Sequence, residues 1–361
     1  FFIHNIIKYW IIIELKEIEK TFIIAEAGSN WKVGSPEEDF EQAKKLIKVA
    51  VDADADAVKF QIFRNNTVYA PNAGQVDYLS DKDLTINQLF EKLSMPYEMI
   101  PKLSNYCKEE EIMFMATPFS VEDAKQIDPY VKIHKIASYE INHVRLLEFI
   151  AKTKKPILIS TGACSYDEID FAINKINENG NNNLGILQCT AKYPAPIETL
   201  NLSTIPELNS RYDLPIGLSD HSLDPIIGPL MSIGIGGKFI EKHFTIDKKL
   251  PGPDHRFALD PQELKLMIKT IRDGEKSKGD KIKKIINEEK ELKEFATRSI
   301  QAIKNIVKGD ILQERINFEI LRPGKRIRGL DARFLNDVNG KKATKDISIG
   351  DGIKDFEWST K

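Results

Sequence analysis

The feature that most constrains the fold is a series of eight short apolar segments, each rich in β-branched residues and bounded by turn residues. Continuous Ile, Val and Phe runs of this length suit strands that are covered on both faces, as in a parallel sheet. The eight segments are residues 22–28, 57–63, 112–119, 130–137, 156–162, 184–191, 214–222 and 238–245.

Helical patterns lie between these segments. One begins after Ser35, a good N-terminal cap that is followed by Pro36 and two acidic residues, and it carries apolar residues at helix spacing. The spacing returns in residues 146–150, 169–176 and 264–271. Eight strand–helix alternations predict a (β/α)8 barrel, which takes about 250 residues. An open doubly wound sheet is the alternative.

The chain has 361 residues, more than a barrel requires. Residues 273–293 are dense in charge and predict a boundary or linker helix. Beyond them, strand-like pieces at 299–302, 316–321 and 343–347 alternate with Gly-containing turns. The sequence therefore predicts a barrel domain at 1–285, a linker at 286–296 and a small β-rich domain at 297–361.

The N-terminal residues 1–13 are strongly apolar but are interrupted by His4, Asn5 and Lys8. The run is too short to span a bilayer and has no small-residue cleavage site after it. We therefore expect residues 1–20 to be an N-terminal extension or a barrel cap, and we assign them no function.

Composition narrows the function classes. Hydrophobic residues make up 42% of the chain and charged residues 29%, which is typical of a globular protein. A net charge of −2 gives no whole-chain reason to expect a nucleic acid or an anionic membrane as partner. The three cysteines are far apart and form no CxxC pair, which favours a reducing, cytoplasmic setting. No Walker loop and no GxGxxG turn after a strand is present, so nucleotide binding is not expected.

Polar residues gather where the predicted strands end. In a (β/α)8 barrel, the carboxyl ends of the strands form the active-site face, so unusual polar residues there indicate catalysis or binding. The candidates are Glu26, Asn30, Lys59, Gln61, Thr117, Lys135, Ser138, Ser160, Thr161, Thr190, Tyr193, Ser219, Asp220, His221, Glu241 and His243.

Several of these charged residues interrupt otherwise apolar strands. Strand alternation puts Lys59 and Gln61 on one face, and likewise Glu241 and His243. A buried lysine or glutamate without a partner is costly, so these side chains must pair with each other or with a ligand. Any one of them fits a structural ion pair equally well, whereas the full set facing one cavity indicates a site. Lysines and serine hydroxyls together suit a phosphate or a carboxylate.

His221 and His243 are predicted on neighbouring strands at similar heights. Two imidazoles with carboxylates nearby suit a divalent metal that keeps positions open for substrate. Two isolated histidines are a weak signal, however, and hydrogen-bonded pocket histidines are the alternative.

A set of short motifs, in order along the chain, resembles the sialic acid synthase family. That family comprises the N-acetylneuraminate synthases and relatives that make other nine-carbon keto sugar acids. The C-terminal segment resembles the antifreeze-like, or SAF, domain of the same family, through Arg298-Ser-Ile300 and Arg322-Pro-Gly324. The barrel motifs are IAEAG (24–28), AVKFQ (57–61), ATPF (116–119), KIAS (135–138), STG (160–162), YP (193–194), GLSDH (217–221) and EKHFT (241–245).

The resemblance implies that phosphoenolpyruvate condenses with an open-chain N-acetylated mannose-type sugar and releases phosphate. It implies that His221 and His243 hold Mn²⁺ or Mg²⁺. Glu26 would orient the attacking water, and Asp254 would reach a sugar hydroxyl. Gln61, Tyr193 and Glu241 match positions near the sugar and the metal. The positions that match phosphoenolpyruvate binding are Lys59, Thr117, Lys135, Ser138, Ser160 and Ser219.

In the family, the SAF domain of one subunit caps the barrel of the other and supplies an arginine to the substrate. Arg322 matches that arginine, so the resemblance implies a domain-swapped homodimer. One departure concerns Ala191, where a bacterial member has Asn; the missing donor is either lost or replaced by Lys192.

The expected product is N-acetylneuraminate, with legionaminic, pseudaminic or spore-coat polysaccharide sugars as alternatives. Two rival functions remain, a metal-dependent barrel aldolase and a non-enzymatic carbohydrate- or ice-binding protein. The two lysines and two histidines argue against the second rival.

Overall fold

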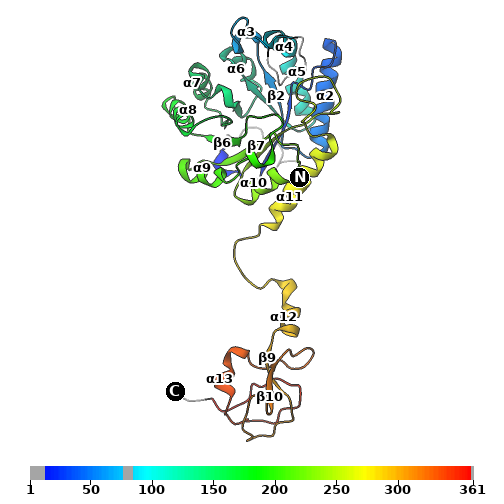
Figure 1. The fold of residues 1–361 in the computed structure, drawn as a ribbon, viewed down its shortest axis with the longest axis vertical. Helices are drawn as coiled ribbons and strands as arrows, with labels where there is room; N and C mark the ends of the chain where they lie inside the picture. Colours follow the sequence, from blue (N-terminus) through cyan, green and yellow to red (C-terminus); the bar gives the residue numbers. More distant parts are fainter. Residues whose placement is uncertain (1–12, 76–83, 359–361) are drawn as a thin grey trace. The chain divides into compact units, whose positions relative to one another are not determined.

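The structure, a computed structural model, describes residues 13–75 and 84–358 (Figure 1). Nearly all of the apolar N-terminal run lies outside these described residues. The chain separates into two compact units that divide between Gly279 and Asp280. The finer division into a barrel ending at 285, a linker at 286–296 and an SAF domain from 297 stays a prediction.

The first unit is built on eight parallel strands. They follow the order β3-β2-β1-β8-β7-β6-β5-β4, and the two end strands of that order, β3 and β4, also lie side by side, which closes the barrel. This confirms the (β/α)8 prediction and rejects the open sheet. The strands are β1 (Phe22–Gly28), β2 (Ala57–Ile62), β3 (Met113–Pro118), β4 (His134–Ile136), β5 (Ile157–Ser160), β6 (Leu184–Cys189), β7 (Ile216–Asp220) and β8 (Phe239–His243).

Each of the eight strands falls inside an apolar segment of the sequence, and most are shorter than predicted. The shortest is β4, because Val131 and Ile133 are buried but only His134–Ile136 form the ladder with β5. The buried apolar segment is therefore longer than the paired strand β4. A hydrophobic pattern alone cannot distinguish buried residues from paired ones.

Helices surround the barrel and pack their apolar faces against the outer faces of the strands (Figure 1). Ser35 caps the first long helix, as predicted, and the structure adds reciprocal hydrogen bonds with Glu38. The helices are α2 (Pro36–Asp52), α5 (Met99–Glu109), α6 (Val121–Ile127), α7 (Val144–Lys152), α8 (Tyr166–Glu178), α9 (Thr204–Tyr212), α10 (Ile227–Gly234) and α11 (Pro261–Ser277).

Between β2 and α5 the chain makes an excursion that the simple strand–helix pattern does not require. It contains the short helix α3 (Asn65–Val68) and the two-turn helix α4 (Ile86–Leu93). Thr85 caps α4 through a reciprocal pair of hydrogen bonds with Gln88. Asn87 ties the two helices together, because its side chain donates to Asn65 Oδ1 at 2.9 Å and to the Ala70 carbonyl at 3.1 Å.

The described residues of the first unit also contain the single-turn 3-10 helices η1 (Leu15–Glu17), η2 (Ser138–Glu140) and η3 (Ile197–Thr199). Leu15 of η1 is fully buried in a cluster with inward-facing strand residues, including Ile24, Leu158 and Phe239. This cluster fills the barrel interior with apolar side chains. The polar residues of the interior are therefore confined to its other end.

The second unit has a small core of its own around Ile300, Leu312 and Phe318. Strands β9 (Ser299–Ala302) and β10 (Phe318–Leu321) pair antiparallel. The remaining elements are η4 (Asn287–Glu289), α12 (Lys290–Ala296), η5 (Ala332–Phe334) and α13 (Leu335–Val338).

One prediction for this region was wrong. Residues 343–347 form no strand, because Ile347 bridges Ile306 while Ala343 bridges Phe356, and two single bridges to different segments make no ladder. The charged stretch 273–293 contains the boundary between the two units, as predicted, but it is not one continuous helix. α11 ends at Ser277, Gly279 adopts φ +62°, and helical structure resumes only at Asn287. The residues between are exposed, so no packed apolar face supports a continuous helix.

None of the helices in residues 13–75 and 84–358 is both long and apolar enough to cross a membrane.

Candidate active site

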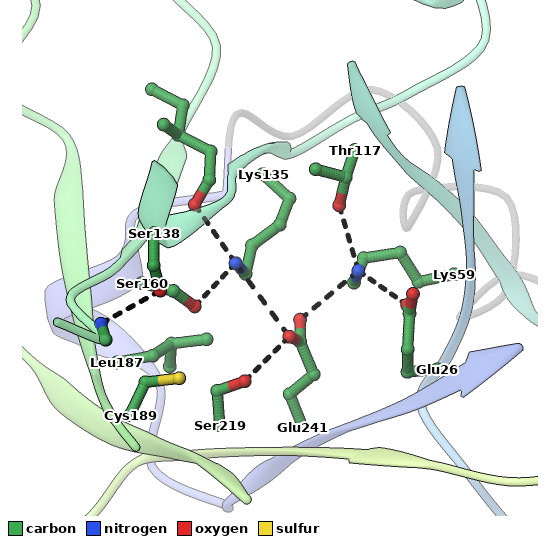
Figure 2. A network of polar contacts seen from close by, with 12 residues as sticks. Glu26, Lys59, Thr117, Lys135, Ser138, Ser160, Leu187, Cys189, Ser219 and Glu241 are labelled. Atoms are coloured by element: carbon green, nitrogen blue, oxygen red, sulfur yellow. Dashed lines mark hydrogen bonds and ion pairs between the residues drawn. The ribbon is translucent and has the colours of Figure 1, made fainter. Parts of the chain in front are cut away.

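A buried polar network occupies the barrel interior toward the carboxyl ends of the strands (Figure 2). Glu26 of β1 and Lys59 of β2 are register partners, and Lys59 Nζ lies 2.5 Å from Glu26 Oε2. The same ammonium donates to Thr117 Oγ1 at 2.9 Å and lies 3.6 Å from Glu241 Oε2. Lys59 thus connects three neighbouring strands with the carboxylate of β8.

Lys135 of β4 approaches the same carboxylate from the other side (Figure 2). Its Nζ donates to Ser160 Oγ at 2.6 Å and to the Ile136 carbonyl at 3.0 Å, and lies 3.8 Å from Glu241 Oε1. Ser219 completes the surroundings by donating to Glu241 Oε1 at 3.0 Å. One glutamate is therefore shared between two buried lysines.

The protonation states leave this network short of negative charge. Burial raises the pKa of Glu26 to about 7 despite the adjacent Lys59. Burial also lowers the pKa of Lys135, which Glu241 offsets only in part. Burial would also lower the pKa of Lys59, but Glu241 and Glu26 outweigh burial, so the pKa of Lys59 is raised overall. For Glu241, burial is outweighed by Lys135 and Lys59, so its pKa is lowered. Near neutral pH, Glu241 is ionised and Glu26 is partly protonated, and a bound anion would favour the charged form of Lys135, so the site suits a further anion.

His221 and His243 lie beside each other, with ring centroids 5.6 Å apart, and Tyr193 stacks on His221 at 4.1 Å. His221 Nδ1 is 2.8 Å from the Thr190 carbonyl, so this nitrogen carries the proton and Nε2 keeps its lone pair. Burial opposes a charge on His221, yet Cys189 and the Thr190 carbonyl raise its pKa overall. A raised pKa favours a second proton on Nε2, and a bound metal ion would compete with that proton for the same lone pair.

His243 is buried, and burial together with His221 holds its pKa well below the usual value, so its imidazole is neutral. Its Nδ1 has no hydrogen-bond partner among the described residues and lies 3.7 Å from Asp254 Oδ2. Two imidazoles with an unused lone pair fit a divalent metal. Within the described part of the chain, no three His, Cys, Asp or Glu side chains converge as a metal cluster. A metal here would draw its other ligands from water or substrate.

Gly28 shows how tightly the strand ends approach one another. It adopts φ +54°, and a Cβ at this position would lie 2.9 Å from Asp254 Oδ2, so a larger residue would displace that carboxylate. Burial raises the pKa of Asp254, while Ser29 donates to it at 3.3 Å. On β2, Gln61 donates to Glu26 Oε1 at 3.1 Å.

A cavity of about 520 Å³ opens over these residues. Five of the residues that the sequence predicted line it, namely Gln61, Ser138, Tyr193, His243 and Asp254. Glu26, Lys59, Thr117, Lys135, Ser160, Ser219 and Glu241 belong to the buried network, and His221 contacts Tyr193 of the lining. Further polar lining comes from Ser29, Glu140 and Arg256.

Arg322 belongs to the second unit. It is exposed there and has no hydrogen-bond or ion-pair partner in residues 13–75 or 84–358. Its predicted role in the site stays a prediction.

Glu140 is a lining residue that the sequence reasoning missed. It follows Ser138 by two residues in η2, is 8% exposed, and its Oε2 has no hydrogen-bond partner among the described residues. Burial raises its pKa to about 8 although Lys135 opposes the shift. Its proximity to the Lys135-to-Ser138 motif was the available signal. As a neutral acid it offers both a donor and an acceptor to the cavity.

Ala191, the departure from the family pattern, lies beside Gly162. A Cβ on Gly162 would come within 3.1 Å of the Ala191 methyl and 2.9 Å of Cys189 Sγ. Lys192 is exposed.

A second buried charge cluster involves the alternate residues of β7 and β8. Lys242 Nζ lies 2.6 Å from Asp220 Oδ2 and donates to the Ser222 carbonyl at 2.7 Å and to Ser222 Oγ at 3.1 Å. Asp220 also accepts the Ser222 backbone N–H at 2.7 Å. This cluster clamps the turn that carries His221.

With this geometry in place, comparison with known proteins identifies the family. The sequence profile of the NeuB family matches residues 46–283, well over half of the chain. The chain belongs to the NeuB family. Its relatives include synthases of sugar acids, as the motifs indicated.

Among the NeuB relatives, the spore coat polysaccharide biosynthesis protein SpsE of Bacillus subtilis is 39% identical over 348 residues, which cover 92% of each protein. A pseudaminic acid synthase of Campylobacter jejuni is 36% identical, covering 94% of this chain and 97% of the relative. The crystal structure of an N-acetylneuraminic acid synthetase from Leptospira borgpetersenii superposes with a TM-score of 0.68 at 30% identity, covering 77% of this chain and 91% of that one.

Proposed function

We propose that this NeuB-family chain condenses phosphoenolpyruvate with an open-chain N-acetylated mannose-type sugar, giving a nine-carbon keto sugar acid and inorganic phosphate. The observation that carries the proposal is the pair of buried lysines that share Glu241 at the carboxyl ends of the barrel strands. N-acetylneuraminate is the expected product. The similarity to a pseudaminic acid synthase and to SpsE supports a related acid as the alternative.

Phosphoenolpyruvate fits the charge deficit of the network. Lys59 and Lys135 are held by strands that cannot move apart without breaking the barrel, so their ammonium groups are fixed before substrate arrives. Charge-assisted hydrogen bonds to phosphate and carboxylate oxygens would complete their incomplete sets of partners. The buried hydroxyls of Thr117, Ser138, Ser160 and Ser219 supply neutral donors around them.

His221 and His243 would hold Mn²⁺ or Mg²⁺, which when bound polarises the sugar carbonyl for attack by C3 of phosphoenolpyruvate. Glu26 would orient the water that adds at C2. With a pKa of about 7, its carboxyl can accept that water's proton near neutral pH. Loss of phosphate from C2 then gives the keto acid. Gln61, Tyr193, Glu140 and Asp254 line the cavity and would bind the sugar hydroxyls and amide.

The decisive assay incubates the full chain with phosphoenolpyruvate, Mn²⁺ and a panel of N-acetylated hexoses, and follows phosphate release and product mass. We expect one phosphate for each nine-carbon acid formed. Removal of metal with EDTA should abolish turnover and Mn²⁺ should restore it, while His221→Ala and His243→Ala should each remain folded and lose most activity. Turnover of pyruvate in place of phosphoenolpyruvate would favour the aldolase rival, and full activity without metal would contradict the metal assignment.

We further propose that Arg322 completes the site of a partner chain in a swapped homodimer. Its exposure and its lack of a partner among the described residues support a role in contacts outside its own unit. Co-expression of Arg322→Ala chains with His243→Ala chains should restore part of the activity, because one site of each mixed dimer would carry both residues. Mixed dimers that show no rescue would disprove the swap and leave the barrel chemistry intact.

A further inference from the structure

The two histidines of the candidate site lie directly beside the second buried charge cluster, which consists of Asp220, Ser222 and Lys242. Asp220 and Ser222 flank His221 in the chain, and Lys242 precedes His243. None of the three cluster residues is among those that line the cavity. The condensation proposed above therefore leaves this cluster without a chemical role of its own.

Strand alternation separates the cluster from the cavity. Asp220 and Lys242 are register partners on β7 and β8, and so are the preceding residues Ser219 and Glu241. Because Ser219 and Glu241 meet in the network of the barrel interior, Asp220 and Lys242 face the surrounding helices. Gly228 of α10 agrees with this placement, since a Cβ there would lie 2.8 Å from Asp220 Oδ2. The same two strands thus carry the network on one face and the cluster on the other.

The carboxylate of Asp220 fixes the backbone on both sides of His221. Its Oδ1 accepts the Ser222 backbone N–H at 2.7 Å, which closes a turn around His221. Its Oδ2 lies 2.6 Å from Lys242 Nζ, and the same ammonium donates to the Ser222 carbonyl at 2.7 Å and to Ser222 Oγ at 3.1 Å. One lysine therefore contacts both chain neighbours of His221 and is itself the neighbour of His243.

These contacts fix the backbone beneath the two imidazoles, whereas the Thr190 carbonyl fixes only the rotation of the His221 ring, through Nδ1 at 2.8 Å. We propose that Lys242 and Asp220 are positioning residues that set the separation of the His221 and His243 imidazoles, and thereby the affinity of this pair for a divalent metal ion. All side chains of the cluster are buried, so water does not replace a contact that is lost. The proposal rests on the metal assignment made above and names the residues that preorganise that site.

The test measures Mn²⁺ binding to the full chain without substrates, with EPR spectroscopy counting the free ion. The double variant Asp220→Asn with Lys242→Met leaves the net charge beside the histidines unchanged and leaves no buried charge unpaired. Its asparagine keeps an oxygen for the Ser222 N–H, but the ion pair between β7 and β8 is lost. The Kd for Mn²⁺ should rise by about 10- to 100-fold, the range expected when a group that orients a metal ligand is removed.

Leu15→Ala is the control for a general loosening of the barrel. Leu15 is fully buried among the apolar residues of the barrel interior, so its truncation should destabilise the fold and leave the Kd for Mn²⁺ unchanged. At saturating Mn²⁺, the double variant should keep the parent KM for phosphoenolpyruvate, because the lysine and hydroxyl network lies on the other face of the strands. The double variant also covers the case in which Lys242→Met alone does not fold.

A double variant that binds Mn²⁺ as tightly as the parent protein would overturn the proposal and leave the cluster as a structural ion pair. An equal loss of affinity in Leu15→Ala would overturn it as well. A parent protein that binds no Mn²⁺ would refute the metal assignment itself, and the positioning role with it. The Kd of the parent protein therefore distinguishes the two failures.

Discussion

The barrel contains two buried clusters of lysine and carboxylate side chains, and the clusters differ in how fully their lysines are paired. Around Lys242, the ammonium has three oxygen partners within 3.1 Å, and one of them is the carboxylate of Asp220. Lys59 and Lys135 each have two oxygen partners within 3.0 Å, but the third partner of both is the shared carboxylate of Glu241, at 3.6 and 3.8 Å. Burial also raises the pKa of Glu26, which lies beside Lys59, to about 7. A cluster that satisfies itself stabilises the fold, and one that stays short of negative charge is prepared for a ligand.

The largest expected effect concerns the complete cluster. Lys242→Met leaves the carboxylate of Asp220 without its cation, and the Asp220 side chain is fully inaccessible to solvent. We expect the free energy of unfolding to fall by about 3–5 kcal/mol. Urea or thermal unfolding measures this loss.

The double variant Lys242→Met with Asp220→Asn removes both charges and should recover part of that stability. If Lys242→Met unfolds like the parent protein, the cluster is not structural and the contrast fails.

The incomplete cluster should behave in the opposite way. Lys135→Met removes an ammonium whose burial is only partly offset, so the free energy of unfolding should stay the same or rise. The value of kcat/KM for phosphoenolpyruvate should fall by about 30- to 1000-fold, which corresponds to about 2–4 kcal/mol of lost substrate interaction. Steady-state kinetics at saturating sugar measures it.

Lys132→Met, three residues earlier in the chain at a half-buried position, is the matched control. A Lys135→Met protein that unfolds early and keeps its kinetics for phosphoenolpyruvate would reverse the assignment of the two clusters.

The smallest effect is a pH dependence set by Glu140. Because burial raises its pKa to about 8, the carboxyl is neutral below that pH and can donate to the acceptor sugar, and it loses this proton above it. The value of kcat/KM for the sugar should therefore decline about tenfold per pH unit above pH 8. Glu140→Gln cannot ionise and should lack this decline.

The same residue makes a prediction for stability. A carboxyl whose folded pKa exceeds its unfolded value stabilises the protein most below the unfolded pKa, and this contribution is lost as the pH rises through about 8. Glu140→Gln should thus be more stable than the parent protein at pH 9. Equal stability at pH 9 together with an unchanged decline would remove Glu140 from the site.

Much of the fold could be predicted from the sequence. A strand that is buried on both faces requires a continuous apolar run, and a helix N-terminus favours Ser or Thr followed by acidic residues. Every predicted barrel strand is present, and Ser35 caps its helix as expected. The secondary structure of the C-terminal unit was predicted less well from the sequence. Residues 343–347 have the composition of a strand, but their partners are two separate segments, and pairing depends on contacts distant in sequence.

The sequence by itself determined that polar residues stand at the ends of eight strands, because the alternation of a strand fixes which neighbours share a face. Only the tertiary structure decided which lysine is fully paired within the fold and which lysine belongs to the candidate site. Lys59 and Lys242 each lie in a buried strand of the barrel, yet Lys59 shares Glu241 with Lys135, whereas Lys242 contacts Asp220 and Ser222. Phe90 of α4 and Glu140 of η2 line the cavity, and only the tertiary structure decided this too, because α4 and η2 reach the cavity only through folding. Whether a buried charge is fully paired depends on distances across the barrel. Packing sets these distances, and the local sequence does not encode them.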